Sequence, residues 1–95
     1  MGRARRHQPE GLADKLKEIR IRLDLSQTQM AEKLSNADPA PRRGHIAEFE
    51  SGSRQPSLSV LLHYSRLAGI HMEVLVDDDL ELPDRLPATR SQKHR

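Results

Sequence analysis

The clearest regularity along the chain is a helical spacing of apolar residues between positions 11 and 23. Leucine or isoleucine recurs at intervals of four, three and four residues, at Leu12, Leu16, Ile19 and Leu23. Side chains at this spacing share one face of an α-helix, which has 3.6 residues per turn. The pattern predicts an amphipathic helix over residues 11–23. Asp24 then stands where a helix end accepts a left-handed residue.

A second helix is predicted directly after the first from a capping signal. The sequence SQTQ at residues 26–29 fits a capping box, in which the side chains of Ser26 and Gln29 each bond to the other residue's backbone N–H. Met30 and Leu34 follow as inward residues. With only about two turns this helix is too short to be stable alone, so it must pack on its neighbours.

A third helix is predicted after the breaker-rich connection SNADPAP at residues 35–41. Pro41 suits the first position of a helix, because its missing N–H would be unpaired there in any case. The helix is expected to run from Pro41 to Glu50, with Ile46 and Phe49 as its inward residues. With so few apolar positions it should be shallowly attached and mostly exposed.

Two further helical segments and a tail complete the pattern. Ser57 is the predicted N-cap of a fourth helix that ends before Gly69, and HMEVLV at residues 71–76 forms a short fifth one. The inward positions predicted for these two are Leu58, Leu61, Leu62, Ser65, Ala68, Met72 and Leu75. Residues 77–95 show no helical period and should form an extended or disordered tail. The fold class is therefore all-α, a compact bundle of about five short helices with an extended C-terminal tail.

The composition agrees with a small helical domain. Ninety-five residues with 35% hydrophobic content, one Phe and one Tyr allow one small aliphatic core. The chain has no cysteine, which excludes disulfides and thiolate metal sites. It has neither an apolar run near the roughly 18 residues of a membrane span nor the apolar core of a signal peptide. We therefore expect a cytoplasmic protein that has no membrane segment.

The charges are separated along the chain although the net charge is only +2. Residues 1–7 are basic, residues 76–84 are largely acidic, and the last eleven residues are basic again. This separation predicts a surface that meets a polyanion in some places only. We divide the chain into a basic arm, a central domain and a tail, at residues 1–10, 11–76 and 77–95. The arm is either a DNA contact or an ordinary solvated tail.

Three stretches together resemble the helix-turn-helix family of phage repressors and Cro proteins, also called XRE-like. They are LKEIRIRLDLSQTQMAEKL (16–34), IAEFESG (46–52) and PSLSVLLHYSRLAGIHMEVLV (56–76). Leu-Ser-Gln opens the second helix, Ala follows that Gln by four residues, Ile-x-x-Phe-Glu-x-Gly closes the third and Pro-Ser-Leu opens the fourth. The resemblance covers about two-thirds of the chain. Its one departure is the connection 35–41, which is longer than the usual turn of about four residues.

The resemblance implies that the third helix lies in the major groove of DNA with its N-terminal residues at base edges. By position the readers are Arg43, Gly44 and Glu48, with Arg42 and His45 close by. Arginine pairs with guanine, glutamate accepts from the cytosine amino group, and glycine lets the backbone approach. The alternatives are solvated arginines, a carboxylate that only rejects other sequences, and a spectator histidine.

The resemblance also implies contacts around the reading helix. Gln27 would contact a phosphate and Thr28 would add a hydroxyl, although capping alone would also explain this stretch. Arg54 is either a phosphate contact or a solvated loop charge. Arg20 and Glu50 would form a structural ion pair between the first and third helices.

These observations predict a sequence-specific, repressor-like DNA-binding regulator of transcription that forms a homodimer on double-stranded DNA. The alternative is an antitoxin-like or other protein-binding regulatory module of the same fold, with a protein partner held through residues 77–95. His45 and Glu48 lie three apart on one helical face, but no HExxH motif, second ligand cluster or nucleophile beside a base accompanies them. We therefore expect no enzymatic activity, no metal and no cofactor.

Overall fold

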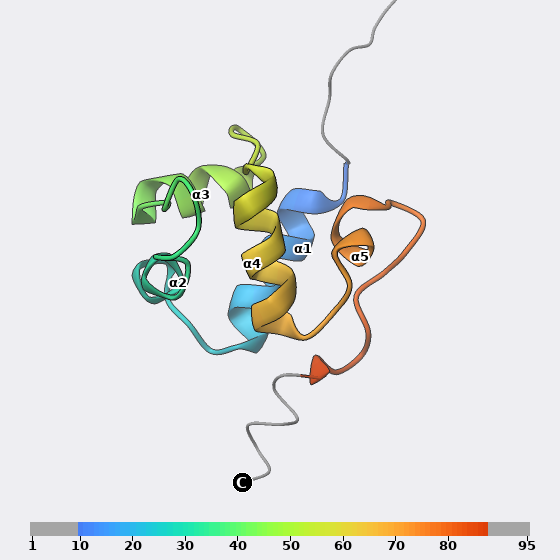
Figure 1. Cartoon of the computed structure of the whole chain (residues 1–95). Coiled ribbons are helices and arrows are strands. Elements are labelled where there is room, and N and C mark those ends of the chain that lie inside the picture. Colours follow the sequence, from blue (N-terminus) through green and yellow to red (C-terminus); the bar gives the residue numbers. More distant parts are fainter. Residues whose placement is uncertain (1–9, 88–95) are drawn as a thin grey trace, which may run out of the picture.

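The computed structural model describes residues 10–87, and this part of the chain forms five α-helices and no strand (Figure 1). The helices are α1 (Leu12–Arg22), α2 (Gln27–Lys33), α3 (Arg43–Ser51), α4 (Leu58–Ala68) and α5 (Met72–Val76). Helix α4 runs through the middle, with α2 and α3 on one side and α5 on the other. The predicted all-α fold is confirmed.

The helix ends follow the local chemistry that the sequence predicts. The capping box of α2 is complete, with Ser26 Oγ 3.0 Å from Gln29 N and Gln29 Oε1 2.8 Å from Ser26 N. Asp24 is left-handed with φ 60°. Ser57 Oγ accepts from the backbone of α4, and Gly69 ends that helix at φ 77°. Each end thus satisfies backbone groups that a bare helix leaves unpaired.

All five helices contribute to one core, which is aliphatic apart from one phenylalanine and one tyrosine. Its fully buried large side chains are Leu12, Leu16, Ile19, Met30, Leu34, Ile46, Val60, Tyr64, Leu75 and Leu86. Helix α3 adds only Ile46 and Phe49 to this core, as predicted. It is therefore held at the surface by few side chains.

Two details of the predicted helices are wrong. Helix α3 begins at Arg43 rather than Pro41, because Arg42 is extended (φ −104°, ψ 172°) and acts as the N-cap. Pro41 precedes the cap and is buried. Leu58 was predicted to face inward, but it is 74% exposed. The buried face of α4 instead includes Val60 and Tyr64.

Residues 77–86 form no helix and return along α1. Leu86 is only 1% exposed and Leu82 packs against the core. The carboxylate of Asp78 accepts from the backbone N–H groups of Glu10 and Gly11 at 2.9 Å each, which caps the N-terminus of α1. Lys15 Nζ donates to the carbonyls of residues 74 and 77 at the end of α5. This stretch of the tail is therefore part of the packed structure.

The predictions for residues 1–9 and 88–95 lie outside the described residues. The division of the chain at residues 10 and 76 stays a prediction. Between residues 10 and 87 no helix has both the length and the apolar character needed to cross a membrane.

Candidate nucleic-acid interface

The outward face of α3 follows from which of its residues are buried. Ile46 and Phe49 point into the core. Since successive residues of a helix are about 100° apart, the opposite side carries Gly44, Ala47, Glu48 and Ser51. Gly44 and Ser51 are exposed, and the other two are partly exposed. Sequence reasoning omitted Ala47 and Ser51, although their offset from the apolar positions could have identified them.

The N-terminal end of α3 concentrates positive charge. Arg42 and Arg43 are both exposed, and the first turn carries no acidic residue. The helix dipole adds a further partial positive charge at this end, so the two guanidinium groups are unfavourably placed within the chain. His45 accepts a hydrogen bond from the Arg42 backbone N–H through Nδ1 at 3.1 Å. This bond satisfies the N–H of the N-cap residue, whereas the Arg42 side chain, having no acceptor, cannot accept from the N–H groups of the first turn.

Nothing in the described part of the chain requires a glycine at position 44. It lies in the first turn of α3 with an ordinary helical conformation, and no atom would lie within 4 Å of a Cβ added there. Glycine costs about 1 kcal/mol relative to alanine inside a helix. The position is therefore open to a close approach from outside.

Glu48 and Arg54 form an ion pair at the C-terminal half of α3. Arg54 Nε donates to Glu48 Oε1. The Arg54 side chain is 52% exposed and the Glu48 side chain is 44% exposed. This hydrogen bond, together with the arginine charge, holds the pKa of the Glu48 carboxyl below its usual value. The predicted phosphate contact and the predicted base reader thus lie side by side in the free protein.

A second ion pair fixes α3 to the scaffold. Arg20 Nε lies 2.7 Å from Glu50 Oε2 and Arg20 Nη2 lies 3.1 Å from Glu50 Oε1. The two side chains are 14% and 5% exposed, and Arg20 Nη1 also donates to the Leu25 carbonyl at 2.9 Å. The hydrogen bond to Glu50 raises the pKa of the Arg20 guanidinium. The pair links α1, the start of α2 and the end of α3.

The start of α2 is joined to the same pair. Gln27 Nε2 donates to Glu50 Oε1 at 3.2 Å, and Thr28 beside it is exposed. The predicted phosphate donor therefore has a partner within the chain. This bond sets the first turn of α2 in a fixed position relative to α3.

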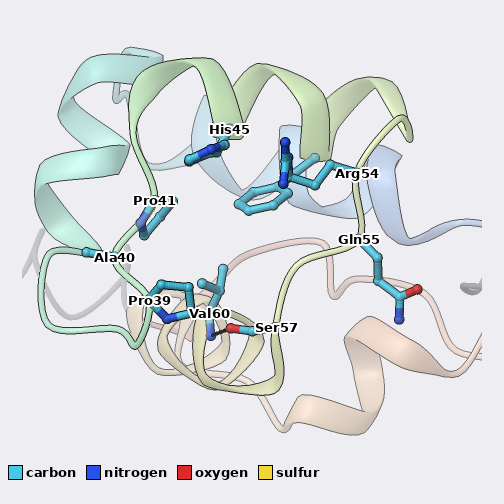
Figure 2. A pocket seen from close by; sticks show the side chains of 9 residues that line it. Pro39, Ala40, Pro41, His45, Arg54, Gln55, Ser57 and Val60 are labelled. Atoms are coloured by element: carbon cyan, nitrogen blue, oxygen red, sulfur yellow. Dashed lines mark hydrogen bonds between the residues drawn. The ribbon is translucent and has the colours of Figure 1, made fainter.

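The long connection between α2 and α3 packs beneath α3 rather than across its outward face. Asp38 N donates to Ser59 Oγ at 2.9 Å, which ties the connection to α4. A hollow of about 220 Å³ lies between this connection, α3 and the start of α4. Figure 2 shows Pro39 and Pro41 on one side of it, with His45 above and Val60 below. The extra residues thus leave the outward face of α3 free.

Comparison with known proteins agrees with this geometry. Residues 16–75 match a family model described as helix-turn-helix. The matched span is more than half of the chain and runs from the middle of α1 to α5. No curated protein and no solved structure matches the chain.

Proposed function

This chain belongs to the helix-turn-helix family of the phage repressor and Cro type, which indicates a DNA-binding regulator of transcription, and we propose that it reads a specific DNA sequence with α3 in the major groove. The observation that carries the proposal is the N-terminal end of α3. There two exposed arginines and a glycine that no contact requires adjoin an outward face whose residues are exposed or partly exposed. A phosphate or a guanine at this end would offset the charge repulsion.

Four residues of α3 and its N-cap have roles in this proposal. Arg43 donates to O6 and N7 of a guanine, and Arg42 and His45 contact phosphates. Gly44 lets the helix backbone approach the floor of the groove. Ala47 lies on the same face, where a methyl group suits contact with the methyl of a thymine.

The start of α2 contacts the DNA backbone in this proposal. The first N–H groups of a helix point toward an anion, and Thr28 adds an exposed hydroxyl. Gln27 keeps its bond to Glu50 and offers its second amide hydrogen to the phosphate. Since both helices are joined at Glu50, a phosphate held by α2 fixes the depth of α3 in the groove.

We further propose that the protein acts in the cytoplasm as a homodimer, paired through α5 and the residues that follow it. Helix α5 buries Leu75 but leaves Val76 exposed. One module of this size buries a limited area on DNA. Two copies related by a two-fold axis would read half-sites about 10–10.5 bp apart.

The alternative is a protein-binding regulatory module that uses residues 77–87. This stretch turns Leu86 into the core and leaves Asp77, Asp78, Asp79 and Glu81 exposed. An acidic surface repels DNA and suits a basic protein partner. Such a partner is compatible with DNA binding by α3, because the acidic stretch lies beside α1 and α5 and not on α3.

In vitro selection from a random pool of duplexes, at a low and a physiological salt concentration, tests the proposal. We expect enrichment of an inverted repeat that survives at the higher concentration. Phosphate contacts alone weaken steeply with salt and carry no sequence information. A pool that shows no enrichment would rule out sequence-specific reading and leave the protein-binding alternative.

A further inference from the structure

The ion pair between Glu48 and Arg54 lies on the surface that the proposed function turns toward DNA. Resting on that function, we propose that the two side chains act as one unit that reads a C·G base pair. In this unit Arg54 positions the Glu48 carboxylate and the carboxylate accepts from the cytosine amino group. Arg54 is then a specificity-determining residue rather than a phosphate contact.

The backbone builds this unit before any DNA arrives. Gly52 ends α3 in the left-handed region at φ 84°, which turns the chain back along the helix. The Glu48 carbonyl then accepts from Ser53 N at 3.0 Å and from Arg54 N at 3.3 Å. Ser51 Oγ donates to the same carbonyl at 3.1 Å. The residue that carries the carboxylate thus also holds the loop that carries its partner.

The geometry leaves complementary groups free at the tip of the unit. Arg54 uses Nε on Glu48 Oε1, so that Oε2 and the two Nη groups have no hydrogen-bond partner within residues 10–87. Both side chains are about half exposed. The lowered pKa of Glu48 keeps its carboxyl ionised at neutral pH, so it can only accept hydrogen bonds. The unit therefore presents an acceptor beside a set of donors.

A C·G pair offers the matching pattern in the major groove. The cytosine N4 amino group is a donor, and it lies next to the O6 and N7 acceptors of the paired guanine. Glu48 Oε2 can accept from N4 while an Arg54 Nη group donates to the guanine. A thymine or guanine opposite the carboxylate would place acceptor against acceptor. The ion pair thus supplies attraction for a C·G pair and repulsion of a thymine or guanine at the cytosine position.

Arg54 also removes an electrostatic obstacle. An isolated carboxylate on the reading face would be repelled by the phosphates of the duplex. The guanidinium compensates that charge at the tip of the side chain, where its Nε bonds to the carboxylate. Loss of Arg54 should therefore affect Glu48 more than it affects the rest of the interface.

The test uses the full-length protein and the duplex that it selects from a random pool. Each base pair of one half-site is replaced in turn by the other three, and binding is measured for the wild type, Arg54→Ala, Arg54→Lys and Glu48→Gln. Arg66→Ala, which removes an exposed arginine in the last turn of α4, is the matched control. Circular dichroism establishes that each variant is folded.

We expect the wild type to prefer C·G at one position by about tenfold or more. Arg54→Ala should reduce that preference to less than about threefold and leave the preferences at other positions intact. Arg54→Lys should restore part of it. Glu48→Gln should move the preference toward adenine, which a glutamine amide pairs with. Arg66→Ala should change none of these preferences.

A uniform loss of affinity in Arg54→Ala, with the C·G preference intact, would overturn the proposal and make Arg54 a phosphate contact. Retention of the preference in Glu48→Gln would overturn it as well. If the wild type selects no duplex at all, the proposed function itself fails, and this inference fails with it.

Discussion

Gly44 shows at the scale of a single residue how a position can cost stability without serving the fold. Its surroundings would accept a methyl group, and its backbone conformation is one that alanine adopts readily. The neighbouring arginines likewise lie where the helix dipole disfavours them. At a site shaped only by folding, such choices would be unexpected, whereas the proposed contact with a duplex would explain all of them together.

Gly44→Ala should raise stability and lower DNA affinity. The gain should be about 1 kcal/mol, because alanine is the better helix former, which is roughly 4–8 °C in the melting temperature of a domain of this size. The added methyl group should hold the backbone away from the base edges and weaken binding. Thermal unfolding and a binding titration on the selected duplex measure the two effects. Unchanged affinity beside the higher midpoint would show that the backbone does not approach DNA there.

The Glu48 carboxyl gives a prediction for pH. Its pKa is lowered by Arg54, so the pair contributes stability above the ordinary pKa of a glutamate, and this contribution is lost as the pH falls through the lowered value. Arg54→Ala should return the pKa toward its ordinary range. An NMR titration of the Glu48 side chain measures this shift. An identical titration curve in the wild type and the variant would show that Arg54 does not pair with Glu48 in solution.

At the scale of the element, α3 is attached by two apolar side chains and one ion pair. Ile46 and Phe49 provide the apolar contact, while Glu50 joins α3 to Arg20 and Gln27. A bidentate pair of this kind fixes orientation as well as distance. The angle of α3 to the scaffold, and hence to a duplex, depends on it.

Glu50→Ala should destabilise the protein by about 3–5 kcal/mol, because it leaves the Arg20 guanidinium largely buried without its partner. Glu18→Ala is the matched control, since Glu18 pairs with Arg22 but is about half exposed. That change should cost no more than about 1 kcal/mol. Chemical denaturation compares the two variants. Equal losses would mean that the buried pair does not hold α3.

The helix ends could be predicted from the sequence because their chemistry is local. A capping box, a left-handed aspartate and a glycine after the last turn each involve groups a few residues apart. The face of α4 could not be predicted, because Leu58 and Val60 are equally apolar and only the packing of the whole bundle decides between them. The start of α3 was misplaced for a related reason, since Pro41 is held by burial against the rest of the chain.

At the scale of the whole molecule, residues 77–87 pack back against the first helix, α1. Asp78 caps the start of α1, and Leu86 lies in the core that α1 lines. Residues 77–87 have no apolar period, so their place in the structure depends on contacts far apart in sequence that no local pattern reveals. Their exposed acids lie beside α1 and α5, whereas the exposed pair Arg42 and Arg43 lies at the start of α3. This charge separation should orient the protein with α3 toward a polyanion.

Leu86→Ala should destabilise the protein by about 2–5 kcal/mol, because it leaves a cavity in the core. Leu58→Ala is the control, since the same change at a side chain that is 74% exposed removes little packing. Thermal and chemical unfolding of the two variants give the comparison. A stability for Leu86→Ala equal to that of Leu58→Ala would show that residues 77–87 do not contribute to the fold.

The central claim is that α3 reads base edges in the major groove, and replacement of guanine by 7-deazaguanine tests it most directly. This analogue lacks only the N7 acceptor, and it is introduced at each guanine of the selected duplex in turn. Binding is measured for the wild type and for Arg43→Ala. We predict that the wild type loses about tenfold in affinity at one guanine per half-site, and that Arg43→Ala loses nothing further there. Equal losses in the two proteins, or no loss at any guanine, would contradict the placement of α3.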